Sequence, residues 1–368
     1  MHSKSYNKST VLIIGPYPPP SGGVATFIKS LMNQEILHRN YNIKLFRTGK
    51  KNETISFPNQ VLKDIFRIVN FLFTLKFKNI NIFHIHTSSY WSFIRNIPYI
   101  LISNHLSKGK IIIHIHGGGF HIFFKKASKP IKKIIKNILN SSNYIIVTSP
   151  SWVKIIGEIC NDFNHIFSIP NGFDEKTFYP IQQEKARERI NLPKEKKILL
   201  NIGSLEDYKG QRYLIESMNE IVKEKNDART YIIGSGSQEV YLKTLIKEYN
   251  LEEYVFLVDA GKPPNEIAQW INACDIFVLP SLTEGNPTVM FECLACGKPF
   301  IGTKVGGVPD IIISDEYGFL SKAKDTKDLT EKISMALNKE WNTEKIIKYS
   351  ENFTWSKIVK NIIDIYQK

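Results

Sequence analysis

Two glutamates eight residues apart, Glu284 and Glu292, carry the clearest chemical signal in this 368-residue chain. Glu284 follows a short apolar run that reads as a β-strand, and Gly285 and Pro287 then lead into a predicted helix that contains Glu292. A strand, a glycine turn and a helix N-terminus in this order place backbone N–H donors at the carboxyl end of a parallel sheet, where anions bind. Two carboxylates beside such donors can accept hydrogen bonds from hydroxyl groups of the same ligand. The segment therefore predicts a site for a phosphorylated, hydroxyl-rich ligand such as a nucleotide-sugar.

The neighbours of Glu292 decide between this interpretation and a purely structural one. In the structural alternative, Glu284 caps a helix and Glu292 is a solvated helix residue. However, Glu292 is flanked by the apolar residues Phe291 and Cys293, and a carboxylate in apolar surroundings is costly unless it has a partner. The ligand-binding interpretation is therefore favoured.

Two further glycine-containing loops follow the first predicted strand of each half of the chain. The first loop is rich in proline and ends in Gly22 and Gly23, which let the backbone approach a ligand just before a helix. The second loop, GSLEDYKG, places Lys209 at the start of a helix, where its ammonium group could neutralise a phosphate. The alternatives are a plain tight turn for the first loop and a solvated surface lysine for the second.

Four histidines lie in two His-Ile-His units, His84 with His86 and His114 with His116, on predicted strands. Because side chains alternate along a strand, each pair shares one face of the sheet. The four rings could hold a metal ion or could be hydrogen-bonded core residues, and the lack of a nearby carboxylate in the sequence favours the core. His116 ends its strand before three glycines, so its neutral imidazole is expected in a cleft, where it could hydrogen-bond a sugar hydroxyl.

These motifs lie between short apolar runs and longer helical patterns that alternate in both halves of the chain. Near-continuous runs of valine, isoleucine and leucine are typical of parallel strands covered on both faces. The alternation predicts an α/β protein with two Rossmann-like, doubly wound parallel sheets. The predicted strands are 10–15, 43–46, 82–86, 111–116, 144–148 and 166–169 in the first half, and 197–203, 230–234, 255–259, 276–280 and 300–303 in the second.

The two halves join where proline, asparagine and glycine adjoin at 170–172. We therefore expect an N-terminal domain at 1–170 and a C-terminal domain at 171–350. The segment 184–192 reads as a helix that leads into the second sheet. A last helix at 351–368 is expected to pack back toward the N-terminal domain.

The net charge of +14 comes entirely from the first half of the chain. Residues 1–170 hold 22 Lys and Arg against 5 Asp and Glu, whereas residues 171–368 hold 27 against 30. This asymmetry predicts an anionic partner for the first half, such as a membrane surface, a phosphorylated acceptor or nucleic acid. Four irregularly spaced cysteines without a second close pair argue against a zinc site.

A lysine-rich amphipathic stretch at 120–139 offers a place for that partner. Apolar pairs alternate there with lysine pairs at roughly helical spacing, and Pro130 is expected to break the helix. Such a segment can lie on an anionic bilayer or can be a solvated helix packed on the sheet. The apolar run 11–14 is too short for a secretory signal, and no run reaches the roughly 18 residues of a membrane span. We therefore expect a cytoplasmic protein that lies peripherally at the inner face of the cell membrane.

Taken together, these motifs resemble those of the family-4 retaining glycosyltransferases of the GT-B fold, over nearly the whole chain. Each motif is weak alone, but their order and spacing are specific. The resemblance implies the GT-B fold, in which two Rossmann-like domains face a central cleft, with the acceptor bound by the domain at 1–170 and the nucleotide-sugar by the domain at 171–350. The matching segments are the Gly22-Gly23 loop, His116-Gly117, Ile169-Pro170-Asn171-Gly172, Phe178-Tyr179-Pro180, Lys209-Gly210, the pair Glu284 and Glu292, and Gly306-Gly307-Val308-Pro309.

The resemblance also implies a role for each matching residue. Glu292 would accept hydrogen bonds from both ribose hydroxyls of the donor, and Glu284 would contact the hydroxyls of the donor sugar. Lys209 would hold the diphosphate, and His116 would lie near the reacting centre. The remaining positions of the expected donor site are Gly22, Gly23, Ser204, Asn286, Pro287, Thr288 and Val289.

One of these positions departs from the family pattern. Many members carry arginine directly after the glycine of the second-domain loop, whereas this chain has Ser204. A single cation, Lys209, would then hold the diphosphate unless another residue such as Arg212 supplies the second.

The reaction implied is transfer of a hexose from a UDP- or GDP-sugar to a hydroxyl of a glycan or lipid-linked acceptor, with retention of configuration, in cell-surface polysaccharide synthesis. No Asp-x-Asp occurs in the chain, so we expect no metal and no cofactor besides the nucleotide-sugar. A nucleotide-dependent dehydrogenase or epimerase is less favoured because Gly-x-Gly-x-x-Gly is missing after the first strand. A basic, non-enzymatic protein that binds nucleic acid or membranes is the other alternative, and no recognised nucleic-acid-binding motif supports it.

Overall fold

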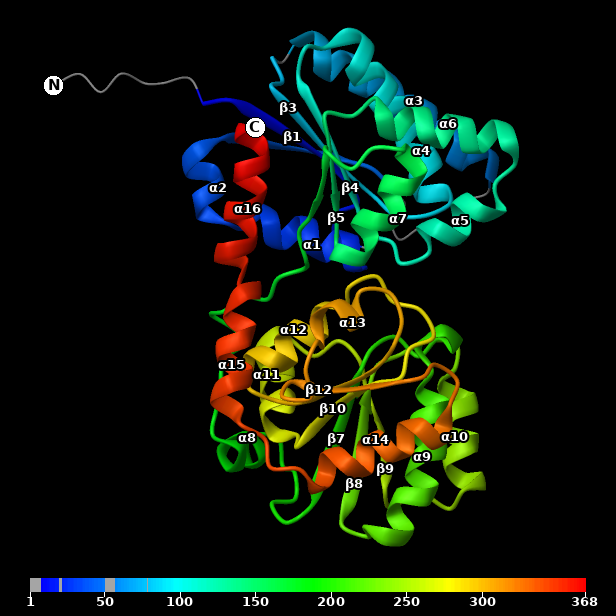
Figure 1. Cartoon of the computed structure of the whole chain (residues 1–368), viewed down its shortest axis with the longest axis vertical. Helices are drawn as coiled ribbons and strands as arrows, with labels where there is room; N and C mark the ends of the chain where they lie inside the picture. The colour runs from blue at the N-terminus through cyan, green and yellow to red at the C-terminus, as the bar shows by residue number, and fades with distance from the viewer. Residues whose placement is uncertain (1–7, 20–21, 50–56, 78) are drawn as a thin grey trace, which may run out of the picture. The chain divides into compact units, whose positions relative to one another are not determined.

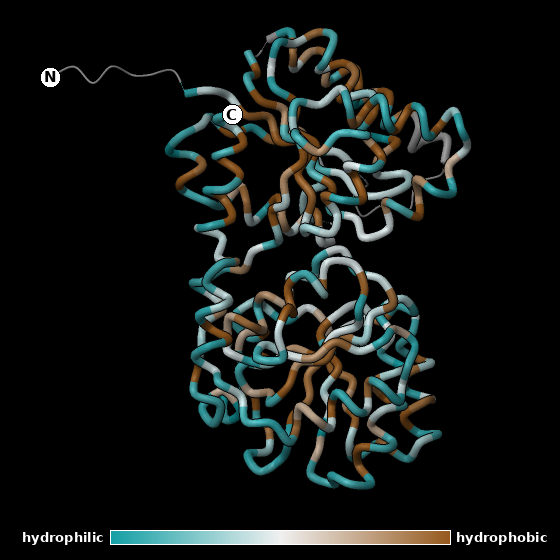
Figure 2. Tube along the Cα trace, viewed as in Figure 1, coloured by the Kyte–Doolittle hydropathy of each residue, from teal (hydrophilic) through white to brown (hydrophobic). Residues whose placement is uncertain are grey.

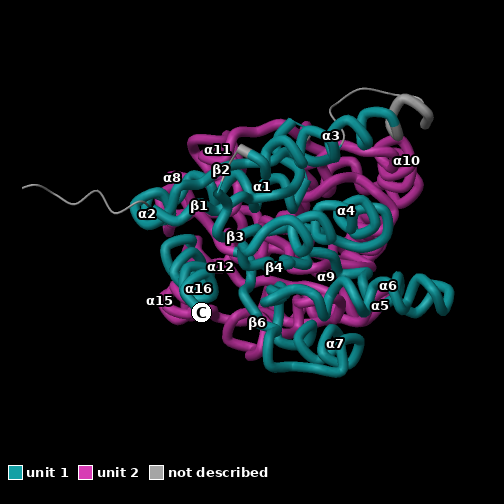
Figure 3. Tube along the Cα trace, turned by 90° about the horizontal axis from the view of Figure 1, so that it is seen from above, with its two compact units in different colours: residues 1–171, 355–368 teal, residues 172–354 magenta. Residues whose placement is uncertain are grey.

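The described residues form two compact units, each built on a six-stranded parallel sheet. Unit 1 comprises residues 1–171 and 355–368, and unit 2 comprises 172–354 (Figure 3). Two Rossmann-like α/β domains are therefore present, as the sequence predicts. The computed structural model describes residues 8–19, 22–49, 57–77 and 79–368.

The inner strands of unit 1 are buried and largely apolar, as parallel strands covered by helices on both faces must be, whereas the two edge strands are only partly buried. They are β1 (Thr10–Gly15), β2 (Asn42–Arg47), β3 (Ile82–Thr87), β4 (Lys110–Ile115), β5 (Tyr144–Val147) and β6 (Ile166–Ser168). Their order in the sheet is β2-β1-β3-β4-β5-β6. Because strands are added on both sides of β1, the sheet has its topological switch point between β1 and β3, where open α/β sheets bind ligands.

Helices cover both faces of the first sheet (Figure 1). One face carries α3 (Phe57–Phe77), α4 (Trp91–Leu106), α5 (Phe120–Lys126), α6 (Lys129–Asn140) and α7 (Pro150–Cys160), which share one apolar core. The other face carries α1 (Gly23–Met32), α2 (Glu35–Asn40) and α16 (Trp355–Gln367), which share a second core. The last helix of the chain thus packs on the first domain. It begins at Trp355 rather than at 351, because residues 351–353 form a short 3-10 turn in unit 2.

Unit 2 repeats this plan with a different strand order, β12-β11-β10-β7-β8-β9. Its switch point lies between β7 and β10, which are neighbours in the sheet. The strands are β7 (Lys197–Ile202), β8 (Ala228–Ile233), β9 (Val255–Val258), β10 (Ile276–Leu279), β11 (Phe300–Thr303) and β12 (Gly318–Ser321). The helices are α8 (Gln183–Arg189), η1 (Asp207–Lys209), α9 (Gln211–Glu224), α10 (Glu239–Glu248), α11 (Pro264–Ala273), α12 (Thr288–Ala295), α13 (Val308–Ile311), α14 (Thr326–Asn338), α15 (Thr343–Ser350) and η2 (Glu351–Phe353).

Three sequence-based expectations for the elements were wrong in detail. Strand β12 was not predicted, because it is a four-residue edge strand without a long apolar run. The helix expected at 184–192 is α8, which ends at Arg189. Pro130 does not break the stretch 120–139: the break falls between α5 and α6, and Pro130 lies in the first turn of α6, where a missing N–H costs nothing.

In the described part of the chain, no helix combines the length and the apolarity that crossing a membrane requires.

Candidate functional site

An ion pair between Lys209 and Glu284 lies at the switch point of the second sheet. Lys209 Nζ donates to Glu284 Oε1 over 2.7 Å, and Ser281 Oγ donates to the same oxygen over 2.7 Å. Glu284 is only 9% exposed and Ser281 is fully buried. Lys209 follows β7 and Glu284 follows β10, so the two strand ends that flank the switch point bring them together. The ammonium group has three hydrogens, and one of them is used in this pair.

Glycines allow the two loops to approach closely enough for this pair to form. Gly210 has φ +68°, and a Cβ there would lie 2.2 Å from the carbonyl oxygen of Pro280. Leu282 N–H donates to the carbonyl oxygen of Tyr208 over 2.7 Å. The loop after β11 closes the other side, because Gly306 has φ +57° and a Cβ there would lie 1.9 Å from the carbonyl oxygen of Glu284. Only glycine fits such an approach at a positive φ.

Glu292 lies on α12, the helix that starts directly behind this turn. It is half-buried, and burial raises the pKa of its carboxyl group to about 7. Among the described residues, no side-chain hydrogen bond or ion pair is recorded for it. The N-cap of α12 is Pro287, which provides no side-chain cap, and the first turn contains no acidic residue. The start of α12 at Thr288 and Val289 therefore presents helix N–H groups without a competing carboxylate.

Ser204 and Arg212 lie near this turn but in different surroundings. Ser204 is exposed, and its carbonyl oxygen accepts a hydrogen bond from Gln211 Nε2 at 3.0 Å. Arg212 donates to Tyr213 Oη over 2.5 Å and stacks its guanidinium over that ring. The Arg212 guanidinium is thus engaged by the neighbouring tyrosine.

Sequence reasoning missed a hollow of about 220 Å³ at the carboxyl ends of β7, β8 and β9. It is lined largely by apolar side chains and by glycine backbone. Glycine-containing turns directly after two predicted strands, at 234–236 and 260–261, were the available signal. A largely apolar hollow with glycine backbone in its lining suits a heteroaromatic ring. The lining residues are Ile202, Gly203, Ser204, Ile233, Gly234, Ser235, Ala260, Gly261, Lys262 and Ile267.

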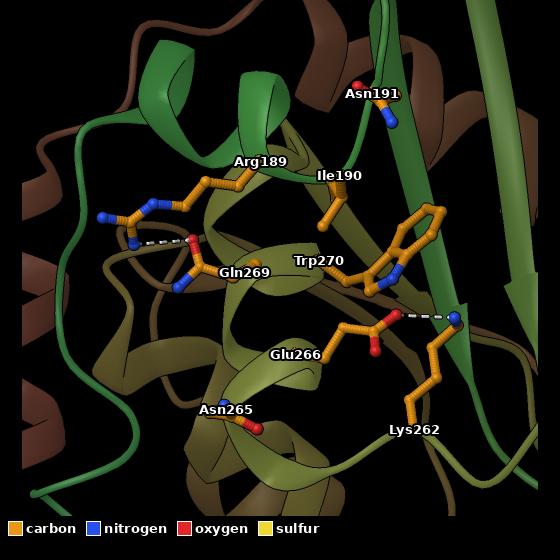
Figure 4. Close-up of a pocket in the computed structure, with 8 residues that line it drawn as sticks. All are labelled: Arg189, Ile190, Asn191, Lys262, Asn265, Glu266, Gln269 and Trp270. Atoms are coloured by element: carbon orange, nitrogen blue, oxygen red, sulfur yellow. Dashed lines mark hydrogen bonds and ion pairs between the residues drawn. The ribbon is translucent and has the colours of Figure 1, made fainter.

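A second hollow of about 500 Å³ adjoins the first and shares Lys262 with it (Figure 4). Figure 4 shows Lys262 paired with Glu266, at 2.6 Å, in front of Trp270, and Arg189 reaching Gln269 at 3.4 Å. None of its lining residues is a predicted site residue. Its lysine is already neutralised by a carboxylate, so this hollow does not extend the anion site at Lys209.

In unit 1, the predicted site residues lie at the carboxyl edge of the first sheet. Gly22 is the N-cap of α1, and neither Gly22 nor Gly23 has a heavy atom within 4 Å of the position that a Cβ would take. A ligand can therefore approach the backbone there. His116 directly follows β4 and is half-buried, and burial lowers the pKa of its ring to about 3. The imidazole is thus neutral at pH 7, as a hydrogen-bonding role requires.

The other three histidines are buried behind His116 in a hydrogen-bonded stack. His86 Nδ1 lies 2.9 Å from His116 Nε2, and His84 Nε2 lies 3.2 Å from His114 Nδ1. The Tyr366 hydroxyl on α16 lies 2.6 Å from His84 Nδ1. His84, His86 and His114 have ring nitrogens within 4.8 Å of one another. The two contacts between histidine rings already occupy four of the ring nitrogens in the stack. The Nε2 atoms of His86 and His114 are buried and have no hydrogen-bond partner among the described residues.

The structure thus groups the predicted residues by unit. Within unit 2 it brings together Lys209 and Glu284 and places Asn286, Pro287 and Glu292 on the same turn and helix. Within unit 1, Gly22, Gly23 and His116 follow strands of one sheet at its carboxyl edge. The buried Ser281, which fixes Glu284, was not predicted; its place directly after a strand was the available signal.

Comparisons with known proteins agree with this architecture. Residues 182–353 match the family model for glycosyl transferases group 1. The chain is 24% identical over 263 residues to the N-acetyl-alpha-D-glucosaminyl L-malate synthase of Bacillus anthracis. The aligned region covers 72% of this chain and 67% of that protein. Its fold resembles sucrose-phosphate synthase from Thermosynechococcus elongatus, with a TM-score of 0.81 and 19% identity over 98% of both chains.

A further solved structure, HepE from Anabaena in complex with UDP, has a TM-score of 0.76 and 15% identity, and the match covers 98% of this chain and 99% of HepE. At such identities, the two solved structures show the fold alone. The family match covers the unit that holds Lys209, Glu284 and Glu292. Residues 182–353 therefore belong to the group 1 glycosyl transferases, and the chain has the GT-B fold.

Proposed function

We propose that this glycosyltransferase moves a hexose, with retention of configuration, from a UDP- or GDP-sugar to a hydroxyl of a glycan or lipid-linked acceptor in cell-surface polysaccharide synthesis. The observation that carries the proposal is the pair of Lys209 and Glu284 at the switch point, with Glu292 on the next helix. HepE has been solved with UDP and with UDP-glucose, and this supports a nucleotide-sugar as the donor.

The geometry of unit 2 suggests how such a donor would lie. The base would enter the 220 Å³ hollow at the ends of β7, β8 and β9. The ribose would reach Glu292, whose carboxylate has no recorded protein partner among the described residues and can accept two hydroxyl hydrogen bonds. The diphosphate would lie between Lys209 and the start of α12, where the helix N-terminus favours negative charge. The sugar would then meet Glu284.

In the proposed reaction, the acceptor hydroxyl attacks the anomeric carbon from the side that the phosphate leaves. The departing phosphate oxygen takes the acceptor proton, and the bond between that oxygen and the anomeric carbon breaks. Lys209 and the α12 N-terminus stabilise the charge that grows on the leaving diphosphate. Glu284 holds the sugar without acting as a base. No Asp-x-Asp is present to hold a metal, which supports metal-independent transfer.

A thermal-shift screen of UDP- and GDP-sugars on the full chain tests this proposal. We expect one donor to raise the unfolding temperature, and we expect Glu292→Gln to abolish that rise while the variant itself stays folded. Glu331→Gln, on the exposed side of α14, is the matched control and should respond as the native chain does. No stabilisation by any donor, or an undiminished rise in Glu292→Gln, contradicts the proposal.

We further propose that unit 1 contacts an anionic membrane surface. Four exposed lysines, Lys125, Lys126, Lys129 and Lys133, lie on α5 and α6, and neither helix contains an acidic residue. A lipid-linked acceptor would require such a surface. Flotation with vesicles that contain or lack anionic lipid tests this contact. Equal binding to both vesicle types would contradict it.

A further inference from the structure

The long helix α3 turns its apolar side chains toward solvent. Six large apolar residues between positions 62 and 73 are each at least 38% exposed. Their spacing of three and four residues places all of them on one face of the helix. A helix on the surface of a globular domain normally presents a polar face to water, whereas α3 packs Ile68, Phe71 and Leu75 against the core and exposes a second apolar face. The residues are Leu62, Ile65, Phe66, Val69, Leu72 and Phe73.

Two of the four charged residues of α3, Asp64 and Arg67, turn toward the protein, whereas Lys63 and Lys76 are exposed. Asp64 lies 2.6 Å from Arg67 and 3.6 Å from Arg95 of α4, and the three side chains are only 15–20% exposed. Phe71 is fully buried and anchors the helix to the core. Rotation of α3 to hide the apolar face would therefore break this ion-paired contact and withdraw Phe71.

The apolar face of α3 belongs to a wider surface on the same side of the first sheet. α4 packs against α3 on one side and against α6 on the other, and all three helices cover the same face (Figures 1 and 3). Figure 2 shows hydrophobic residues along these outer helices. Among the described residues, 14 of the 22 exposed large hydrophobic side chains fall between positions 62 and 134. This concentration marks a surface that a partner covers.

Charge decides which partner fits. Trp91 and Ile94 of α4 and Ile131 and Ile134 of α6 are also exposed, on helices that cover the same face of the sheet. The lysines of α5 and α6 lie beside them, without acidic residues on those helices. An apolar face with a lysine rim and an exposed tryptophan is the pattern of a helix that lies in the interface of an anionic bilayer. If a second copy of the chain covered this surface, its own lysines would lie against the lysines of α5 and α6, and like charges repel.

We infer that α3 lies in the plane of an anionic bilayer and inserts its apolar face between the lipid headgroups. The inference deepens the proposed function and rests on it for the lipid-linked acceptor. It adds a hydrophobic anchor that works independently of the lysines. Lysines attract the protein to the surface through charge that salt screens, whereas burial of the α3 side chains is insensitive to salt.

The test is flotation of the full chain with phosphatidylcholine vesicles that contain phosphatidylglycerol, at low and at high salt. In the double variant Phe66→Ser/Phe73→Ser, we expect partition to fall about tenfold or more at both salt concentrations. The matched control Val240→Ser/Met335→Ser removes exposed apolar side chains from α10 and α14 of unit 2 and should float as the native chain does. Undiminished partition of the α3 variant overturns the inference.

Two further measurements separate this inference from its alternatives. Light scattering of the native chain and the α3 variant gives their oligomeric states, and a native dimer that the variant converts to monomer would assign the face to a second copy and overturn the inference. Donor-dependent thermal shift, measured without vesicles, reports on donor binding separately from membrane contact and should be the same in both proteins. If no donor binds the native chain, the proposed function fails, while loss of flotation in the variant still supports the membrane role of α3.

Discussion

Lys209 and Glu284 are 75 residues apart in the chain, yet Lys209 Nζ lies 2.7 Å from Glu284 Oε1. The pair is possible because β7 and β10 are adjacent in the sheet although β8 and β9 separate them in sequence. Each residue follows the carboxyl end of its strand, where the crevice of an open α/β sheet lies. The strand order therefore creates the site, and the glycines at 210 and 306 let its loops close around it.

Loss of the Lys209 ammonium group should mainly impair turnover. Lys209→Gln removes the cation that would stabilise the leaving diphosphate, and we expect kcat/KM to fall about 10²- to 10³-fold. Glu284 keeps its hydrogen bond from Ser281 in the variant, so the fold should persist. Nucleotide release from the donor measures the effect. Lys243→Gln, which breaks an exposed pair with Glu239 of 2.6 Å, should leave the rate unchanged; an equal loss in both variants would refute a specific role.

Gly306 should tolerate no side chain, because two constraints act on it at once. Its φ is +57° and an added Cβ would meet the Glu284 carbonyl oxygen at 1.9 Å, whereas Gly261 has φ +86° with open space around it. Both alanine variants incur backbone strain, but only Gly306→Ala must also displace the turn that holds Glu284. We expect it to lose about 1–3 kcal/mol more stability than Gly261→Ala. Thermal unfolding of both variants checks this, and similar losses would count against the close approach.

Metal removal should not affect turnover. With no Asp-x-Asp in the chain, the charge on the leaving diphosphate would be balanced by Lys209 and helix N–H groups. Rates measured with and without EDTA should therefore agree. A loss in EDTA that Mg²⁺ or Mn²⁺ restores would show that a divalent ion takes part.

The two sheets were predictable because buried parallel strands leave long apolar runs in the sequence. Strand β12 left no such signal: it is four residues long and begins with Gly318, where a Cβ would lie 1.8 Å from the carbonyl oxygen of Phe300. The packing of a neighbouring strand, and not local propensity, determines that element. The effect of Pro130 was also predicted wrongly. A proline breaks a helix in its interior but is tolerated in the first turn, so its effect depends on where the helix starts.

The candidate site was predictable only in part. Glu284 and Glu292 stand out because carboxylates follow an apolar strand and interrupt an apolar helix. The contact of Lys209 with Glu284, and the role of Ser281, depend on strand order, which no short motif encodes. The hollow at the ends of β7, β8 and β9 is formed by backbone and small apolar side chains, so it has little chemical signature in the sequence. The hydroxyl of Tyr366 contacts His84 from the far end of the chain, and the sequence alone does not predict this contact.

The burial of Glu292 should make the stability of unit 2 depend on pH. The pKa of its carboxyl group is raised from 4.5 to about 7, so the folded state binds more protons than the unfolded state between these values. Stability therefore falls as pH rises from about 4.5 to 7, and the full penalty persists above that range. Glu292→Gln removes the charge, and we expect it to stabilise unit 2 by about 1–2 kcal/mol at pH 8 and by little at pH 4. Unfolding curves at both pH values test this; an equal effect at both would exclude a role of the charge.

Donor binding should show the opposite dependence on pH through the same carboxyl group. Ionised Glu292 can accept hydrogen bonds from both ribose hydroxyls, whereas the protonated acid has lost part of this capacity. With a pKa of about 7, the ionised fraction rises about tenfold between pH 6 and pH 8. We expect donor affinity, measured by calorimetry, to rise by up to this factor over the same range. In Glu292→Gln the affinity should be lower and flat between these pH values, because the amide does not titrate. Glu331→Gln should keep the native profile, and a native affinity that is independent of pH would rule out Glu292 as the ribose acceptor.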